Sequence, residues 1–196
     1  MPSIAFFDFD GTITTRDSML ELIKFHHGKT RLYTGVAVLS PWIVAMKLKL
    51  ISNQKAKEKL LAWFFKDYNI LTFSKICTAF IQKKLPQIIN PAAVEKIAEH
   101  KKNGDEVVVV SASATDWIDR WCKENEVGCI ATQLEVVNGK ITGKLAGINC
   151  NYNEKASRIL HEYDLNNYAD IYCYGDTKGD KAMLQLATHP FFRTFN

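Results

Sequence analysis

The sequence predicts an α/β fold, with a parallel sheet flanked by helices and a long helical segment inserted after the first strand. Short apolar runs alternate with helical patterns at both ends of the chain, an order typical of parallel sheets. Residues 17–84, by contrast, are helical in composition and contain few β-rich runs. Polar clusters directly follow several of the apolar runs. Parallel sheets bind ligands at the carboxyl ends of their strands, so these clusters mark a candidate site.

The first strand is predicted at Ile4–Phe7, an apolar run that ends in acidic residues. This pattern is typical of a buried strand whose carboxyl end meets solvent. Breaks in the helical segment predict about four helices. The breaks lie at Gly28, Gly35, Ser40-Pro41 and Ser52-Asn53.

The rest of the chain predicts further strands and helices in alternation. Pro91 starts a helix that ends near Asn103-Gly104, where Gly is a natural cap. The run EVVVV at 106–110 is the clearest buried strand. The Asn138-Gly139 pair predicts a hairpin turn. Further helices are expected at 116–125, 154–163 and 180–187, hairpin strands at 129–137 and 140–146, and a buried strand at 170–174.

The composition is that of an ordinary globular protein. The chain has 196 residues and is 47% hydrophobic, which argues against collagen-like, coiled-coil and disordered classes. Its five cysteines are widely spaced without a CxxC pair, so we expect reduced thiols. Acidic residues at 8 and 10 come too early for a signal peptide, and the apolar stretch 36–46 is too short to cross a bilayer. These features predict a cytoplasmic location.

The charge is distributed unevenly along the chain. Residues 13–91 contain 13 Lys and Arg against 4 Asp and Glu, a net charge of +9, whereas the remaining residues sum to −5. Lysines such as Lys55, Lys57 and Lys59 could be the solvated faces of helices or could attract an anion. The sequence leaves these two interpretations equally open.

The first polar cluster is Asp8-Phe9-Asp10-Gly11-Thr12, directly after the first strand. Two carboxylates at this spacing, with Gly allowing a sharp turn, can face one ligand. A nucleophilic carboxylate beside a second, acid–base carboxylate suits aspartyl-phosphate chemistry. A plain turn or a calcium loop would also fit the motif alone, but Met19 stands where the calcium loop needs Glu.

Three more clusters follow later in the chain. Ser111 ends the EVVVV strand and offers a hydroxyl for a phosphate oxygen, whereas Ser113 or Thr115 is better explained as a helix cap. Lys155 lies at a predicted helix start, where a surface lysine is the default interpretation. The sequence GDTKGD at 175–180 adds two carboxylates suited to Mg²⁺ and its surroundings.

The four clusters together are far more specific than any one of them. The sequence resembles the haloacid dehalogenase-like (HAD) phosphohydrolase superfamily, whose four motifs match 8–12, Ser111, Lys155 and 175–180. The insertion resembles the helical, C1-type cap of subfamily IB, the phosphoserine-phosphatase-like group. The run VVVVSASATDW and the basic insertion are also similar to the branch that contains phosphatidylglycerophosphatase C. The resemblance implies a Rossmann-like core formed by 1–12 and 92–196, with a cap at 13–91.

The resemblance also implies roles for individual residues. Asp8 would attack phosphorus, and Asp10 would protonate the leaving oxygen and later activate water. Thr12, Ser111 and Lys155 would bind the phosphoryl oxygens.

The implied cofactor is Mg²⁺. Its ligands would be Asp8, the backbone carbonyl of Asp10, and Asp176, with Asp180 in support. Phosphoryl transfer mainly needs positioning and charge neutralisation, which this residue set supplies.

Three functions remain open at this stage. The first is a phosphatase for a small phosphorylated metabolite resembling phosphoserine. The second is a phosphatase for a phospholipid head group such as phosphatidylglycerophosphate, favoured by the basic, partly apolar insertion, which is then a candidate for peripheral contact with the inner membrane face. The third, a non-catalytic phosphate-binding protein, is disfavoured because all four motifs are intact. No nucleic-acid partner is expected.

Two further features bear on the substrate. Asp17 stands near the position of a substrate-contacting Glu in phosphoserine phosphatases, but we favour a helix N-cap there. His26-His27 is interpreted as a helix end before Gly28 rather than a metal pair, because adjacent helix positions face different ways.

Overall fold

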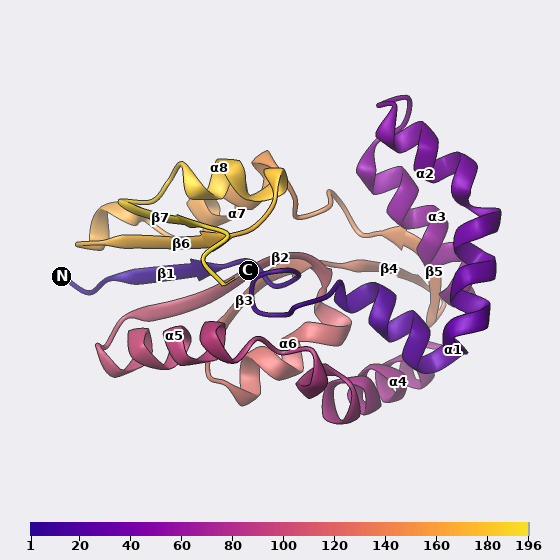
Figure 1. Cartoon of the computed structure of the whole chain (residues 1–196), viewed down its shortest axis with the longest axis horizontal. Helices are drawn as coiled ribbons and strands as arrows, with labels where there is room; N and C mark the ends of the chain where they lie inside the picture. The colour runs from indigo at the N-terminus through magenta and orange to yellow at the C-terminus, as the bar shows by residue number, and fades with distance from the viewer. Residues whose placement is uncertain (196) are drawn as a thin grey trace.

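A computed structural model describes residues 1–195 and contains a five-stranded sheet in the order β3-β2-β1-β6-β7 (Figure 1). Every pair of neighbouring strands in this sheet is parallel. The predicted α/β fold with a parallel sheet is therefore confirmed. The strands are β1 (Ile4–Phe7), β2 (Glu106–Ala114), β3 (Gly128–Thr132), β6 (Ile171–Gly175) and β7 (His189–Phe192).

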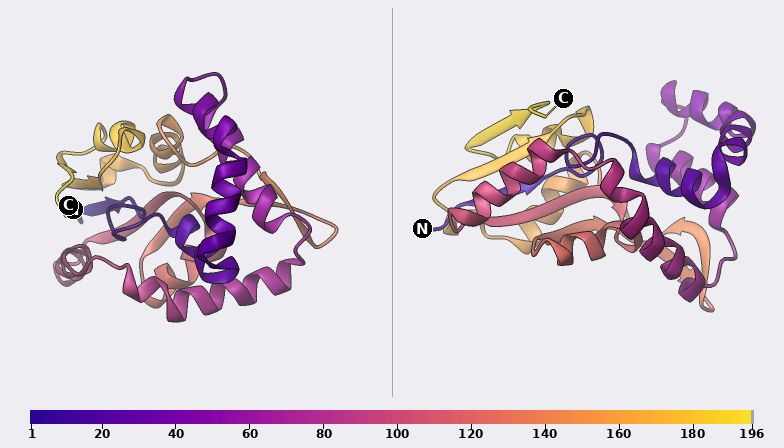
Figure 2. Two further views of the ribbon diagram at one scale, coloured as in Figure 1. Left: turned by 45° about the vertical axis from the view of Figure 1, so that its right-hand side comes forward. Right: turned by 60° about the horizontal axis from the view of Figure 1, so that its bottom comes forward.

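Helices cover both faces of the sheet (Figure 2). Successive side chains of β1 point to opposite faces, so Ile4 and Phe6 join one apolar core while Ala5 and Phe7 join the other. The core around Phe7 is closed by α5 and α6, and the core around Phe6 by α7 and α8. These helices are α5 (Pro91–Lys102), α6 (Thr115–Glu124), α7 (Asn153–Glu162) and α8 (Lys181–Leu184), with short 3₁₀ turns at Leu85–Gln87, Leu165–Asn167 and Lys178–Asp180.

The insertion forms four helices, as the sequence predicts. Asp17 caps the first of them, because its carboxylate accepts a hydrogen bond from the Leu20 N–H at 2.9 Å. The helical backbone of this element is interrupted at Gly28, directly after His26-His27, because Gly28 has a φ of 82°, and helical structure resumes from there to Val38. The predicted helix end at His26-His27 is therefore confirmed as a break inside this element. The four are α1 (Ser18–Val38), α2 (Ser40–Lys47), α3 (Asn53–Phe65) and α4 (Ile70–Lys83).

Two segments connect the core of the protein to these four helices, one entering the insertion and one leaving it, and the two segments lie side by side. The Asn90 N–H donates to the Ile13 carbonyl, and the Thr15 N–H donates to the Ile88 carbonyl, each at 2.8 Å. The two ends of the insertion are thereby held together at one place above the sheet.

The predicted hairpin is shorter than expected and packs against the insertion. Its strands are β4 (Leu134–Val137) and β5 (Lys140–Leu145), joined through Asn138 and Gly139 with φ of 50° and 72°. Gly143 packs so closely on the Ala62 backbone that a Cβ there would clash with it. The prediction of one hairpin strand at 129–137 is wrong, because 129–132 belongs to β3, where it pairs with β2.

The C-terminal part also departs from the predictions. The helix expected at 180–187 covers only Lys181–Leu184, and β7 was not predicted. β7 is a short edge strand that contains Pro190 and lacks a buried face, so the sequence carries little strand signal there. All five cysteines are free thiols, and four of them are buried. Within residues 1–195, no helix combines the length and the apolar character needed to cross a membrane.

Candidate active site

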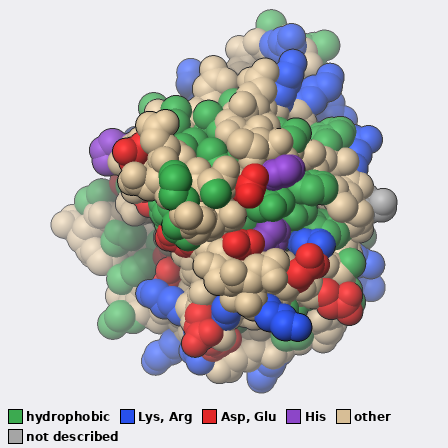
Figure 3. Space-filling view, turned by 90° about the vertical axis from the view of Figure 1, so that its left-hand side faces the viewer, with side chains coloured by type: hydrophobic (Ala, Val, Ile, Leu, Met, Phe, Trp, Pro, Cys, Tyr) green, Lys and Arg blue, Asp and Glu red, His purple; other side chains and the backbone are tan. Residues whose placement is uncertain are grey.

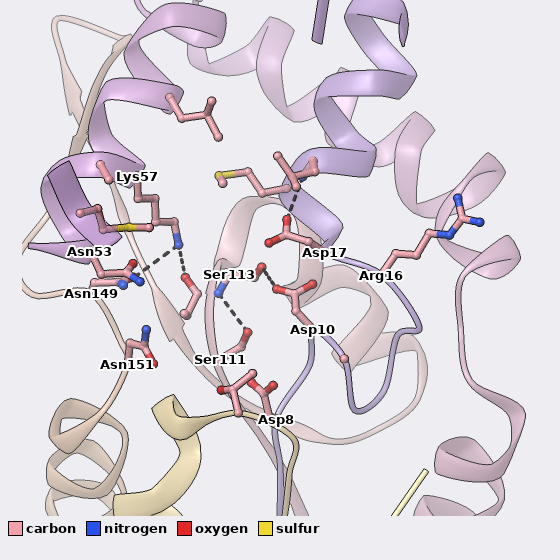
Figure 4. Close-up of a pocket in the computed structure, with 18 of the residues that line it drawn as sticks. Asp8, Asp10, Arg16, Asp17, Asn53, Lys57, Ser111, Ser113, Asn149 and Asn151 are labelled. Carbon is pink, nitrogen blue, oxygen red and sulfur yellow. Dashed lines mark hydrogen bonds between the residues drawn. The ribbon is translucent and has the colours of Figure 1, made fainter. Parts of the chain in front are cut away.

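A cavity of about 590 Å³ lies where the carboxyl ends of β1, β2 and β6 face the insertion (Figure 4). Its floor consists of polar residues from the four sequence motifs. We call this set the floor: Asp8, Asp10, Ser111, Lys155, Asp176 and Asp180. Its opposite side is made by α1, α2 and α3.

Lys155 links two of the floor carboxylates. Its side chain is 1% exposed, so it is not the surface lysine that its position near a helix start suggests. Its Nζ lies 2.5 Å from Asp8 Oδ1 and 2.7 Å from Asp180 Oδ1. One buried cation is thus shared between Asp8, at the end of β1, and Asp180, after β6.

Asp10 is held by groups from two other elements. Its Oδ1 accepts a hydrogen bond from the Ser18 N–H at 2.6 Å, and its Oδ2 accepts one from Ser113 Oγ at 2.5 Å. Ser113 Oγ also lies 2.9 Å from Ser18 Oγ, to which the Trp117 indole donates at 3.1 Å. This chain of buried groups fixes the orientation of the Asp10 carboxylate.

Neither predicted cap role at the start of α6 is correct. The residue before α6 is Ala114, and no side chain caps that end. Ser113 instead donates to Asp10, and its N–H donates to Ser111 Oγ at 2.9 Å. Ser111 is itself buried and lines the cavity (Figure 4).

Gly11 allows the first and fourth motifs to meet. Its φ is 85°, which disfavours residues with a side chain, and a Cβ at this position would clash with Asp176 Oδ2. The Asp176 carboxylate therefore packs directly against the Gly11 backbone, in space that a side chain at residue 11 would occupy.

The floor fits a divalent cation. Asp8, Asp176 and Asp180 each have a carboxylate oxygen within 4.8 Å of the others. In the described chain, Asp176 Oδ1 and Thr12 Oγ1 are buried without a hydrogen-bond partner. Buried polar atoms normally have a hydrogen-bond or metal partner. A cation that prefers oxygen ligands would supply one to Asp176 Oδ1, and a ligand oxygen would supply one to Thr12 Oγ1.

The hydrogen bonds distinguish the acidic residues from one another. Asp180 uses Oδ1 for Lys155 and Oδ2 for the backbone N–H groups of Asp176 and Thr177 and the Thr177 hydroxyl. Both Asp10 carboxylate oxygens are also occupied. The carboxylate oxygens left without a hydrogen-bond partner to hold a cation therefore belong to Asp8 and Asp176.

The shifted pKa values reflect four carboxylates around one lysine. Burial, with the charges of Asp180 and Asp10 in addition, raises the pKa of Asp8 to about 7 despite Lys155. Burial alone would lower the pKa of Lys155, but Asp8 and Asp180 hold it above its ordinary value. Burial and Asp180 also raise the pKa of Asp176. Negative charge is in excess here, which favours a bound cation.

The side of the cavity facing the floor is mostly apolar. We call it the wall, and it comes entirely from α1, α2, α3 and their junctions. Its apolar members are Met19, Leu20, Leu39, Trp42, Ile43, Met46, Ala56 and Leu60.

One cation reaches into the cavity from the wall. Lys57 on α3 donates to the Ala112 carbonyl next to Ser111, and to Asn149 Oδ1 at 3.3 Å (Figure 4). Burial lowers its pKa, while Asp10 and Asp17 oppose that shift. Of the three lysines left open above, Lys57 thus lies beside the floor, Lys55 is exposed, and Lys59 lies over the Trp42 ring at 4.7 Å.

Asp17 caps α1 and also lines the cavity. Although solvent reaches it through the cavity, crowding by the surrounding protein and the charge of Asp10 raise its pKa to about 6. The side chain of Asp17 is therefore available to a substrate in the cavity, near the charges of both Asp10 and Lys57.

Sequence reasoning missed Ser18, Trp117 and the roles of Ser113 and Lys57. Ser18 and Ser113 are 95 residues apart, and the run VVVVSASATDW that contains Ser113 does not indicate a contact with Asp10. The strand and helix pattern alone gave no signal that α1 and α6 meet at Asp10.

Comparison with known proteins agrees with this geometry. Residues 5–185 match the haloacid dehalogenase-like hydrolase family. The chain is 30% identical to Protein CicA of Caulobacter vibrioides over 198 residues, covering 99% of this chain and 87% of that protein.

Two solved structures share the fold. A Bordetella pertussis Tohama I protein of unknown function has a TM-score of 0.80 at 19% identity, covering 96% of this chain and 88% of that one. A phospho-aspartyl intermediate analogue of phosphoserine phosphatase has a TM-score of 0.69 at 22% identity, covering 95% and 83%. With the family match across nearly its whole length, the chain belongs to the haloacid dehalogenase-like hydrolases.

Proposed function

We propose that the protein is a Mg²⁺-dependent phosphatase that hydrolyses a phosphomonoester through an aspartyl phosphate on Asp8. The observation that carries this proposal is the buried Asp8–Lys155–Asp180 group next to two unsatisfied oxygens, Asp176 Oδ1 and Thr12 Oγ1. A phosphoryl group needs positive charge and hydrogen-bond donors around its oxygens. Lys155, Ser111 and Thr12 supply them.

Each floor residue has a role in this mechanism. An Asp8 oxygen attacks phosphorus while the ester oxygen leaves with a proton from Asp10. Asp10 then removes a proton from the water that attacks the aspartyl phosphate, releasing inorganic phosphate and restoring Asp8. The bonds from Ser18 and Ser113 keep the Asp10 carboxylate oriented between the two steps.

Mg²⁺ would be held by Asp8, the Asp10 carbonyl and Asp176, with Asp180 orienting the loop that carries Asp176. When bound, it would neutralise charge on the floor and on the phosphoryl oxygens. The hydrogen bonds that Asp180 accepts from the Asp176 and Thr177 N–H groups support this division of roles.

We also propose that residues 13–91 act as a cap over a core formed by 1–12 and 92–196. The paired passages at Ile13–Asn90 and Thr15–Ile88 support a boundary there. A cap over the floor would exclude water while the phosphoryl group reacts.

Hydrolysis of a generic aryl phosphate tests the reaction class. We expect turnover with millimolar Mg²⁺ and none in excess EDTA, with recovery when Mg²⁺ is restored. Full activity in EDTA would remove the metal from the mechanism, and no turnover under any of these conditions would favour a phosphate-binding protein without catalysis.

Two substrate classes are candidates. A small phosphorylated metabolite, phosphoserine-like, agrees with the resemblance to phosphoserine phosphatases and with Asp17 and Lys57 beside the floor. A phosphate ester on a lipid head group is the second candidate, favoured by the apolar wall.

A series of n-alkyl phosphates separates the two candidates. If the wall binds the organic group, KM should fall by up to about fourfold for each methylene that reaches it, since burying a methylene gives roughly 0.8 kcal/mol. A KM independent of chain length, together with efficient phosphoserine hydrolysis, would favour the small metabolite.

A further inference from the structure

The helix α2 has an apolar surface that the rest of the protein leaves uncovered. No residue of α2 is buried, and Trp42 and Val44 are 42% and 53% exposed. In the following loop, Leu48 and Leu50 are 65% and 75% exposed. Lys49 between them has a φ of 60°, so the chain turns sharply at this point. Figure 1 shows α2 and this loop at the end of the molecule remote from the amino ends of the strands.

The same surface is basic. Between Glu21 and Glu58 the sequence contains seven Lys and Arg and no Asp or Glu. Lys47, Lys49 and Lys55 make no ion pair within the part of the chain that the structure describes. Figure 3 faces the opposite end of the molecule, where acidic side chains lie among the basic ones across the lower half of the view.

A lysine-lined groove lies next to both this surface and the cavity. The groove, of about 670 Å³, is lined by Lys47, Lys49 and Lys55 and by Tyr152 from the segment before α7. Met46 and Asn53 line both the groove and the cavity. Trp42 is exposed on the outside and also lines the cavity. The outer surface, the groove and the wall therefore adjoin one another and share lining residues.

We propose that α2 and its loop bind an anionic phospholipid bilayer, from which the cavity takes a phosphomonoester with an apolar chain. We call the binding residues the α2 surface: Trp42, Val44, Lys47, Leu48, Lys49 and Leu50. The part of this inference that concerns the substrate rests on the second candidate of the proposed function, a phosphate ester on a lipid head group. Binding of the bilayer itself does not require turnover.

The chemistry of the α2 surface favours a bilayer over other occupants. Interfacial helices place Trp and Leu at the boundary between head groups and acyl chains while lysines contact anionic head groups. The alternation Lys47-Leu48-Lys49-Leu50 provides both kinds of contact in one loop. An acidic protein surface would pair with the lysine charges, but it would not bury the exposed leucine side chains.

Co-sedimentation of the full chain with vesicles tests the proposal. The vesicles are phosphatidylcholine alone, or phosphatidylcholine with about one third phosphatidylglycerol. We expect binding to the anionic vesicles only, weakened at high salt because screening shortens the reach of the lysine charges. No binding to anionic vesicles by the unmodified protein would overturn the proposal.

Charge reversal locates the binding surface. Lys47→Glu with Lys49→Glu should weaken binding to anionic vesicles by roughly ten- to a hundredfold. The matched control is Lys75→Glu with Lys83→Glu, which makes the same charge change at exposed positions of α4. Equal losses in both double variants would show attraction by net charge alone and overturn the assignment to α2.

Polar substitution tests the apolar contribution. Leu48→Ser with Leu50→Ser leaves the charge unchanged and should weaken binding by about tenfold. If these changes have no effect while Lys47→Glu with Lys49→Glu does, the lysines alone hold the protein on the vesicles, and the proposed insertion of the leucines is overturned. Both leucines are highly exposed, so the variant should fold.

An inactive variant separates this proposal from the proposed reaction. Asp8→Asn protein should bind anionic vesicles as the unmodified protein does, because Asp8 lies on the floor and not on the α2 surface. Bilayer binding without any hydrolysis would contradict the proposed function alone. Hydrolysis of aryl phosphate without bilayer binding would contradict this inference alone.

Discussion

The floor and the wall of the cavity are built by opposite principles. On the floor, buried charges hold one another in fixed positions, as in the Asp8–Lys155–Asp180 group. On the wall, α2 buries no residue and presents apolar side chains toward the cavity and toward solvent. The floor can therefore fix the geometry of one reaction, whereas the wall can change with little cost to the fold. We infer that the floor determines the chemistry and the wall determines the substrate.

The largest expected effect comes from removing the floor carboxylates. Asp8→Asn should abolish turnover of every phosphomonoester, because no nucleophile remains. Asp10→Asn should lower kcat by roughly 10²-fold or more, as expected for a lost general acid. Steady-state hydrolysis of aryl and long-chain alkyl phosphates measures both.

Asp170→Asn, at a half-exposed position outside the cavity, is the control. Substantial activity in purified Asp8→Asn protein would falsify the assignment of the nucleophile. A loss confined to one substrate class would break the distinction between floor and wall.

A wall substitution should act on substrate binding and spare the reaction. Trp42→Ala should raise KM for a decyl phosphate by about tenfold and change kcat for an aryl phosphate by less than about twofold, since the lost contact is apolar. Trp63→Ala is the matched control, because Trp63 is about as exposed but does not line the cavity. Equal effects on short and long substrates would refute a wall that recognises an apolar chain.

Much of the fold, and the grouping of the floor residues, could be predicted from sequence. Asp8, Ser111 and Asp176 each stand at the end of an apolar run, and a parallel sheet brings such ends to one edge. The burial of Lys155 in the site could not be predicted in this way, because a single lysine at a helix start follows no local pattern that distinguishes it from a surface lysine. Lys155 entered the site only through the resemblance to a family.

Other contacts depend on how distant elements pack. Ser113 bonds Asp10 because α1 and α6 meet at Ser18 and Trp117, which no local pattern encodes. The run 129–137 is similarly ambiguous, because a single residue, Gln133, separates β3 from β4. Local periodicity identifies strands there but not the sheet that each one joins.

A pair of glycine substitutions measures how closely the floor is packed. Gly11→Ala and Gly104→Ala both place a side chain at positive φ, which costs about 1 kcal/mol. Only Gly11→Ala would also push against Asp176, because nothing lies within 4 Å of a Cβ at Gly104. We expect both variants to melt a few degrees lower.

Binding of Mg²⁺ distinguishes the two glycine variants. Gly11→Ala alone should bind Mg²⁺ more weakly, by about tenfold, because Asp176 is displaced. Calorimetric titration with Mg²⁺ provides the measurement. Equal Mg²⁺ affinity in the two variants would count against Asp176 as a ligand.

The last expected effect is on stability, and its sign follows from the raised pKa of Asp8. In the folded, metal-free protein this pKa is about 7, against an ordinary value of 3.8. Between these values the folded state binds more protons than the unfolded state, so the free energy of unfolding falls as pH rises from about 4 to 7.

The Asp8→Asn variant does not lose stability in this way as pH rises, because its amide does not ionise. The inactive variant should therefore melt higher than the unmodified protein at pH 7.5 in EDTA, by on the order of 5 °C, and the difference should vanish near pH 4. Adding Mg²⁺ should stabilise the unmodified protein more than the variant and reduce the gap. Thermal melts across this pH range provide the measurement, and a gap that does not change with pH would mean that the Asp8 carboxylate is not destabilised by burial on the floor.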